Sequence, residues 1–221
     1  MSHLHALAGS VGSSGGSVPV GLYTHLQTIT LSSHSFYVEF SSSNSVLPWS
    51  GFSDLELWVH AKTTDTSTAA PHLAIRMHGQ ADANEHVSHE MNSYNGGARN
   101  TSASTVRSSY GKLGQIPPLR TDGTSNANSN AWGHYRVKFP FVNHNLGTHG
   151  STAKYKKAIG MGNWGGMYSH NGGWSHNSVV HEDGSVTGKG ALTMFQIICI
   201  TAGNFYIGSK FSLYGIRESE A

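Results

Sequence analysis

Histidine is the residue type in this sequence that offers the most chemistry. The 221 residues include 15 histidines, and imidazole both binds metal ions and titrates near neutral pH. Two groups of histidines lie close together in the sequence: His86 and His89, which stand between two glutamates, and His170, His176 and His181. Neither group has the spacing of a known metal motif, such as HExxH on a helix or the paired Cys and His of a zinc finger. The sequence therefore predicts no metal ion and no cofactor, and it favours hydrogen-bonded surface histidines.

A pH-sensitive contact surface formed by these same five histidines remains an alternative. Protonation of every histidine would add fifteen positive charges to a formal net charge of +2. Repulsion between neighbouring subunits would then increase. We therefore expect acid to weaken any symmetric assembly of this chain.

A second candidate for chemistry is the glycine-, asparagine- and histidine-rich segment 162–190, which we interpret as a loop. It carries three aromatic side chains, Trp164, Tyr168 and Trp174. Exposed aromatic rings flanked by amide side chains can stack on sugars while the amides bind the sugar hydroxyls. Tryptophan and tyrosine are also favoured at contacts between proteins. We therefore expect these three residues to contact either a glycan or a neighbouring subunit.

The patterns that signal catalysis are weak throughout the chain. The sequence contains no GxSxG nucleophile elbow and no phosphate-binding P-loop. It also contains no GxGxxG fingerprint between a predicted strand and a predicted helix. Asp54 and Glu56 share one face of a predicted strand and are interpreted as solvent-facing. Cys199 lies in the most hydrophobic segment, where a thiol is usually an inert core group. We predict that the protein is not an enzyme, and a metal-dependent β-sandwich enzyme is kept as the third hypothesis.

Apolar and polar residues alternate with a period of two along most of the sequence, which predicts strands. Residues 54–62 show the clearest pattern, with Leu55, Leu57 and Val59 on one face. Residues 191–202 are apolar on both sides and predict a central strand buried on both faces. Further strands are predicted at 22–31, 36–40, 73–78, 86–94, 135–141, 155–161 and 210–216. Many strands and no convincing helix predict an all-β fold, an antiparallel β-sandwich of jelly-roll type with long loops.

The domain organisation follows from the same patterns. Residues 1–21 are rich in glycine and serine and predict an extended N-terminal arm, and residues 22–221 predict a single β-sandwich domain. Residues 95–130, which are rich in Ser, Thr, Asn and Gly, predict a long surface excursion that contacts partners.

Composition excludes several classes of protein. The chain has 14 Lys and Arg against 12 Asp and Glu, which argues against a protein that packages nucleic acid. A single cysteine excludes an intramolecular disulfide framework. No segment reaches the roughly 18 apolar residues of a membrane span, and no secretory signal is recognised. Only 12% of residues are charged, so little repulsion opposes assembly into a homo-oligomer.

The second half of the sequence resembles a known group of proteins. The segments NSY at 92–94, KYKKAIG at 154–160 and IGSKFSLYGI at 207–216 occur in this order. They resemble virion proteins of tailed bacteriophages, in which an Asn-x-Tyr segment, a lysine-containing strand and a terminal GS-x-x-SLYGI strand recur. The resemblance spans roughly residues 90–217 and is closest at residues 207–216. It implies a β-sandwich structural component of a phage particle that acts by assembly.

These observations together predict a bacteriophage virion structural protein, specifically a capsid decoration or cement subunit that stabilises the shell through contacts between subunits. The alternative is a tail-fibre or baseplate module that binds a glycan on the host surface. The expected partners are other virion subunits, the major capsid protein or tail proteins, with no nucleic acid and no membrane. The expected location is the virion, assembled in the host cytoplasm.

Overall fold

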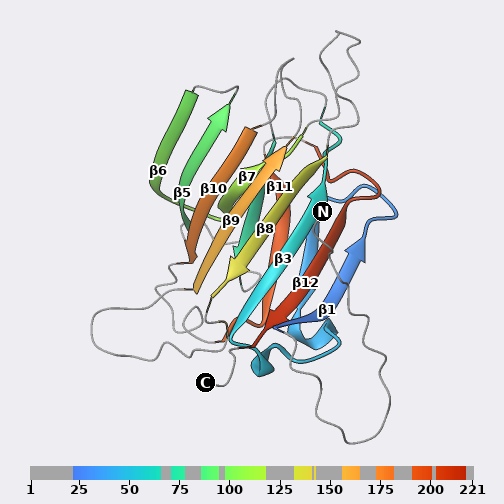
Figure 1. The fold of residues 1–221 in the computed structure, drawn as a ribbon. Helices are drawn as coiled ribbons and strands as arrows, with labels where there is room; N and C mark the ends of the chain where they lie inside the picture. The colour runs from blue at the N-terminus through green and yellow to red at the C-terminus, as the bar shows by residue number, and fades with distance from the viewer. Residues whose placement is uncertain are drawn as a thin grey trace, which may run out of the picture.

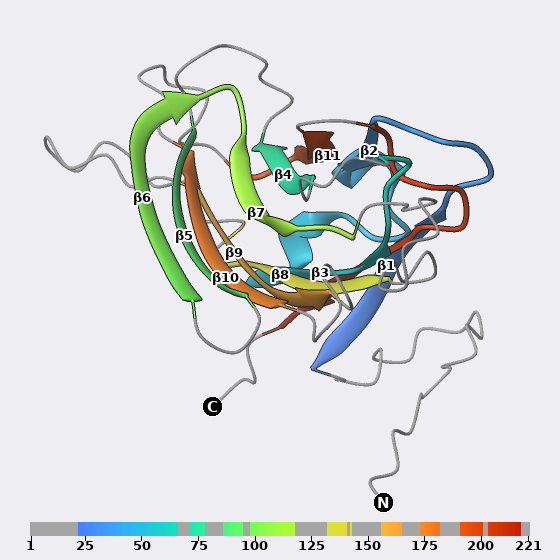
Figure 2. The ribbon, with the colours of Figure 1, turned by 90° about the horizontal axis from the view of Figure 1, so that it is seen from above.

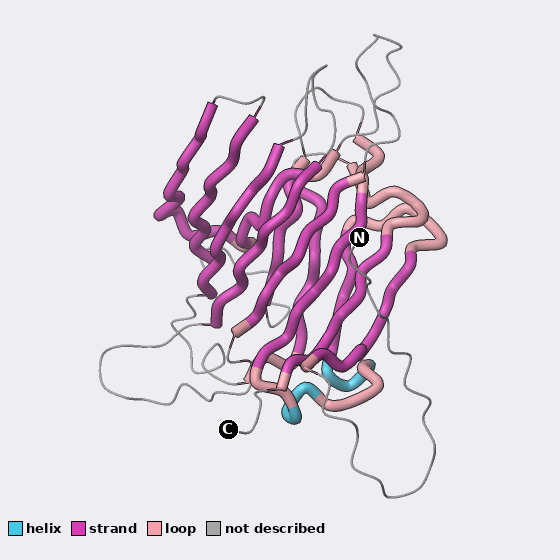
Figure 3. Tube along the Cα trace, in the orientation of Figure 1, coloured by secondary structure: helices cyan, strands magenta, loops and turns pink. Residues whose placement is uncertain are grey.

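The fold consists of two antiparallel sheets packed face to face. The computed structural model describes residues 22–65, 71–77, 86–94, 98–117, 132–140, 142, 156–164, 173–181, 191–200 and 203–217. Strands dominate these residues, and their helical segments are two short 3-10 turns, Ser42–Asn44 and Trp49–Gly51 (Figure 3). The predicted all-β sandwich is therefore confirmed, whereas the predicted arm, residues 1–21, lies outside the described part of the chain.

The two sheets differ in size. In spatial order, the larger sheet contains β1 (Tyr23–Thr30), β12 (Lys210–Ile216), β3 (Asp54–Ala61), β8 (Gly133–Phe139), β9 (Lys156–Trp164), β10 (Gly173–His181), β5 (His86–Tyr94) and β6 (Ala98–Ser108) (Figure 1). The smaller sheet contains β2 (Tyr37–Ser41), β11 (Met194–Ile200), β4 (His72–Met77) and β7 (Gly111–Gln115). Seen from above, the smaller sheet lies inside the curve of the larger one (Figure 2).

The strand order is that of a jelly roll. The strands β1-β12-β3-β8 lie opposite β2-β11-β4-β7. The chain crosses from one sheet to the other between β1 and β2, β2 and β3, β3 and β4, β4 and β5, β6 and β7, β7 and β8, β10 and β11, and β11 and β12, while β4 and β7 are neighbours in the smaller sheet. This interleaving gives two sheets whose apolar faces cover each other, as in the jelly rolls of viral capsid and lectin domains.

Two inserted pairs of strands extend the larger sheet beyond β8. The strands β5 and β6 lie between β4 and β7 in the sequence, and β9 and β10 lie between β8 and β11. The two pairs join each other because β10 pairs with β5 in antiparallel register, from Trp174↔Ser93 to His181↔His86.

The insertions correct two of our predictions. Residues 95–130, predicted as a surface excursion, contain β6 and β7, and Leu113 and Ile116 are fully buried in the core. Segment 162–190, predicted as a loop, contains the end of β9 and all of β10. Both predictions were wrong because these strands are rich in Ser, Asn, Gly and His and lack the apolar alternation by which the other strands were recognised.

The core joins the two sheets through aromatic rings. Phe195 of β11 stacks on Phe139 of β8, with ring centroids 4.5 Å apart, and on Phe40 of β2 at 5.2 Å. Leu55 and Leu57 of β3 are fully buried in the same core, as their alternation predicts. Each fully buried side chain of this size stabilises the fold by about 1.5–3 kcal/mol.

The central strand β11 is buried on both faces, as predicted. Phe195, Ile197 and Cys199 face the main core. On the opposite face, Ile198 and Ile200 form a second small cluster against Ala74 and Tyr110. Within the described residues, no helix is long and apolar enough to span a membrane.

Glycines allow close approach at two places in the larger sheet. A Cβ atom at Gly160 of β9 would lie 2.8 Å from the carbonyl oxygen of Leu113 in β7. A Cβ atom at Gly215 of β12 would overlap the ring of Phe52. Gly160 therefore lets β7 of the smaller sheet pack closely against β9, and Gly215 lets Phe52 of the β2–β3 connection pack against β12.

Candidate functional site

The outer face of the larger sheet, turned away from the smaller sheet, carries cross-strand rows of side chains. Side chains alternate along a strand, so residues that pair across antiparallel neighbours point to the same face. Two such rows cross β12, β3, β8 and β9. The first row is Lys210, His60, His134 and Asn163, and the second is Ser212, Trp58, Arg136 and Met161.

A groove lies between the two rows. Its volume is about 580 Å³, within the range of small-molecule sites. All eight residues of the two rows line it, and Tyr214 lies beside its β12 end. Val59, Tyr135 and Gly162 form the floor, and the side chains of Val59 and Tyr135 are buried on the inner side. The walls of the groove are therefore outward side chains, and its floor is the backbone of the sheet.

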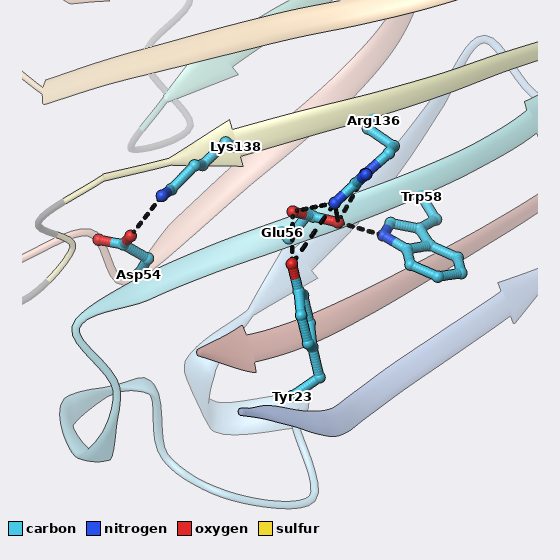
Figure 4. Close-up of polar contacts among 6 residues, drawn as sticks. All are labelled: Tyr23, Asp54, Glu56, Trp58, Arg136 and Lys138. Carbon is cyan, nitrogen blue, oxygen red and sulfur yellow. Dashed lines mark hydrogen bonds and ion pairs between the residues drawn. The ribbon is translucent and has the colours of Figure 1, made fainter. Parts of the chain in front are cut away.

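Glu56 is the centre of a hydrogen-bond network next to the groove (Figure 4). The interpretation of Glu56 as solvent-facing is wrong, because it lies on the outer face but neighbouring side chains cover it and leave it only 4% exposed. Its carboxylate accepts hydrogen bonds from Nε and Nη2 of Arg136, each at 2.9 Å, and from the indole Nε1 of Trp58. The hydroxyl of Tyr23 donates to the same carboxylate at 3.4 Å. The paired bonds fix the plane of the guanidinium, so Trp58 and Arg136 are held in place before any ligand binds.

Two ion pairs neutralise most of the charge on this face. Arg136 and Glu56 approach to 2.7 Å, and the hydrogen bond to Glu56 raises the pKa of the Arg136 guanidinium. Lys138 and Asp54 lie 2.9 Å apart, and the hydrogen bond to Asp54 raises the pKa of the Lys138 ammonium. In the part of the chain that the structure describes, Lys210 makes no ion pair.

An aromatic surface borders the second row. Trp58 is 41% exposed, and the guanidinium carbon of Arg136 lies 5.7 Å from its ring centroid. The ring of Tyr214 lies 5.1 Å from that of Trp58 and 5.5 Å from that of His25. Aromatic rings therefore continue from β3 across β12 to β1.

Two imidazoles stand side by side in the first row. The rings of His60 and His134 stack with centroids 4.5 Å apart and planes 10° apart. Burial, and then the neighbouring His134 and Lys210, lower the pKa of His60. His60 is therefore neutral at pH 7 and offers the groove a flat ring without charge.

Of the three aromatic residues predicted as contacts, the structure places the backbones of Trp164 and Trp174 near the groove. Trp174 of β10 pairs with Asn163 of β9, so its backbone lies one strand beyond the first row. Trp164 is the last residue of β9 and pairs with Gly133 and Gly173, while Tyr168 lies outside the described residues. Their contact with a glycan or a subunit stays a prediction.

The five predicted histidines gather on two neighbouring strands, apart from His170, which the structure does not describe. His86 of β5 pairs directly with His181 of β10. In the same pair of strands, His89 lies opposite Ser178 and His176 lies opposite Met91. The pH-sensitive contact surface formed by these residues stays a prediction.

The groove itself was missed in the sequence. Trp58, His60 and Arg136 stand on the polar sides of predicted strands, but Asn163 falls in the segment predicted as a loop. Nothing along the chain shows that the four strands of the groove are neighbours. One signal was present, because Trp58 stands between Glu56 and His60 on the polar face of a predicted strand. An exposed aromatic residue can form part of a binding surface when other apolar side chains lie beside it.

The remaining reactive groups of the described residues do not form a second site. Burial, followed by the nearby Asp65, raises the pKa of the Cys199 thiol to about 12, which fits its interpretation as a core group. Among the described side chains, no three His, Cys, Asp or Glu groups lie close enough together to hold a metal ion.

Comparisons of the chain with protein-family models, with curated proteins and with solved structures find no match.

Proposed function

We propose that this chain is a structural subunit of a bacteriophage particle, specifically a decoration subunit that binds the capsid. The observation that carries the proposal is the position of residues 207–216, where the resemblance to tailed-phage virion proteins is closest. They lead into and form β12, which pairs with β1 on one side and with β3 on the other. The segment is therefore an integral strand of a jelly roll, a fold that viral capsid proteins share with other classes.

Exposed apolar side chains at one end of the sandwich support contacts with neighbouring subunits. Phe36 is 47% exposed in the β1–β2 connection, and Ile207 is 44% exposed in the β11–β12 connection. The two connections lie together, because the backbone N–H of Ile207 donates to Nδ1 of His34 at 3.2 Å. A subunit that covered this end would remove apolar surface from water.

Strand edges offer a second kind of contact. Among the residues that the structure describes, no strand pairs with the outer edge of β1 or of β6. The edge strand β6 has 11 residues, and its outward N–H and C=O groups suit pairing with a strand of another subunit. Such pairing would add stability to a repeated assembly.

A tail-fibre or baseplate module that binds host glycan is the second candidate. The groove beside the exposed ring of Trp58 favours it, because sugar-binding sites combine an accessible aromatic face with a few polar groups.

Quantitative mass spectrometry of purified particles tests both candidates. The particles come from the phage whose genome encodes this chain. We expect the chain in every particle, at hundreds of copies for a decoration subunit and at about a dozen for a tail module, since each place in the particle has its own symmetry. Absence from purified particles, with the chain abundant in the infected cells, would overturn the proposal.

A further inference from the structure

We propose that the groove between the two rows binds an acidic saccharide, a sugar chain that carries carboxylate groups. The inference assigns a ligand class to the outer face of the larger sheet. It does not depend on a place in a virion, because the groove belongs to the isolated chain.

The shape of the groove suits an extended ligand. It crosses four strands, β12, β3, β8 and β9. Three inter-strand spacings give a length of about 14 Å. Because its walls are two rows of side chains on an open sheet face, a linear chain can lie across the strands and leave at both ends.

Stacking is provided by a ring that is fixed in advance. The ring of Trp58 is 41% exposed, and its Nε1 donates to the buried carboxylate of Glu56. The C–H face of a sugar ring packs against an aromatic face of this kind. Because the ring is already held, binding orders few further side-chain rotations.

Polar side chains that can bind sugar hydroxyls line the groove. Asn163 is exposed in the first row, and its amide both donates and accepts hydrogen bonds. The imidazole of His60 and the hydroxyl of Ser212, which accepts a hydrogen bond from Thr28, are further polar groups along the walls. Sugar hydroxyls both donate and accept hydrogen bonds, so they match such neutral groups.

Charge decides the class of saccharide. No Asp or Glu is among the residues that line the groove. Lys210 is exposed at one end without an ion pair to any described residue, and the guanidinium of Arg136 uses Nε and Nη2 for Glu56, leaving Nη1 available. A carboxylate between these two cations would form charge-assisted hydrogen bonds.

The same charge balance argues against nucleic acid. Of the lysine and arginine side chains that line the groove, Arg136 pairs with Glu56 and Lys210 pairs with no described carboxylate, and the pKa of His60 is lowered. Binding of a phosphate backbone requires several basic groups along its path. A sugar chain with occasional carboxylates fits one free lysine better.

Isothermal titration calorimetry with the full chain tests the inference. The probes are a galacturonic acid oligosaccharide, the neutral galactose oligosaccharide of equal length and a single-stranded oligodeoxythymidine. We expect saturable binding of the acidic probe and at least about tenfold weaker binding of the neutral one, which is the loss expected for one charge-assisted contact. Lys210→Gln should weaken the binding of the acidic probe by about tenfold and leave the binding of the neutral probe unchanged.

Matched variants separate the groove from the general surface. Lys157→Gln removes an exposed lysine of β9 that does not line the groove, and it should leave binding unchanged. Trp58→Ala should weaken both sugars, whereas Trp58→Phe should retain part of the affinity. Thermal unfolding of each variant shows whether it is folded under the binding conditions.

Three outcomes would overturn the inference. They are no binding of the acidic probe by the folded wild type, equal binding of the acidic and neutral probes, and a loss in Lys157→Gln as large as in Lys210→Gln. If the oligodeoxythymidine bound more tightly than the acidic saccharide, the saccharide assignment would be wrong and the groove would be assigned to nucleic acid. None of these results bears on the presence of the chain in phage particles, so the failure of this inference and of the proposed function are distinguishable.

Discussion

Glu56 organises the outer face of the larger sheet at the scale of single residues. Its carboxylate is 4% exposed and accepts hydrogen bonds from Arg136, Trp58 and Tyr23. A buried carboxylate is stable only when its partners replace water. The three donors come from three different strands, so the network also holds β1, β3 and β8 in register.

Replacement of Glu56 by glutamine should therefore destabilise the fold. We expect Glu56→Gln to lower the free energy of unfolding by about 1–2 kcal/mol, a modest loss because Arg136 is half exposed and solvent screens the pair. Glu39→Gln is the matched control, since Glu39 is exposed and accepts a hydrogen bond from Gln196 at 2.8 Å. Urea unfolding measures both, and an equal effect of the two substitutions would contradict the role of Glu56.

His72 of β4 should make stability depend on pH. Its Nδ1 is buried and has no hydrogen-bond partner among the described residues, and burial, followed by Lys112, lowers its pKa to about 4. In the unfolded chain, this imidazole takes up a proton near pH 6.5. The contribution of neutral His72 to the free energy of unfolding is therefore complete above pH 6.5 and is lost as the pH falls towards 4. The loss is on the order of 2–3 kcal/mol.

A variant without this imidazole tests the assignment. His72→Leu should lose less stability than the wild type between pH 7 and pH 4, as measured by urea unfolding at each pH. An equal decrease in the free energy of unfolding of both proteins between pH 7 and pH 4 would show that His72 does not cause it.

At the scale of elements, the inserted strand β9 completes the groove. It supplies Met161 and Asn163, and at Gly160 it lies against β7 of the smaller sheet. The groove therefore depends on the close packing of β9 over β7.

A side chain at Gly160 should disturb this packing. We expect Gly160→Ala to lower the free energy of unfolding by about 1–3 kcal/mol, because the new Cβ meets the backbone of Leu113 and cannot move aside. Gly51→Ala is the control, since nothing lies within 4 Å of a Cβ there, and its effect should stay within about 0.5 kcal/mol. Equal unfolding midpoints for the two variants would contradict the close approach.

The sequence predicted elements where apolar residues alternate and missed them where they do not. The strands predicted within residues 54–62 and 191–202 are confirmed as β3 (Asp54–Ala61) and β11 (Met194–Ile200), because their burial follows from their own pattern. The strand β10 was missed, since Ser175, Asn177 and Ser178 give no apolar alternation. The groove could not be predicted, because Lys210, His60 and Asn163 become neighbours only through the strand order of the sheet.

At the scale of the whole molecule, acid should act on assembly through the histidines. Not all fifteen contribute at pH 5, because burial lowers the pKa of His72 to about 4. The remaining protonation still makes the chain strongly positive, and like charges on neighbouring subunits repel each other.

Sedimentation velocity at pH 7.5 and pH 5 measures this effect. We expect smaller species at pH 5, and added salt should restore the larger ones by screening the charges. Circular dichroism confirms that the chain stays folded at both values. An assembly of unchanged size at pH 5 would contradict a role for the histidines.

We propose that this jelly roll works by attaching to other parts of a phage particle. The most direct measurement is co-sedimentation of the purified chain with particles from a phage whose copy of the gene is deleted. We expect the chain to pellet with these particles up to a fixed number of copies, and to do so less after Phe36 and Ile207 are both changed to serine. A chain that stays in the supernatant at every concentration, although it is folded, would contradict the claim.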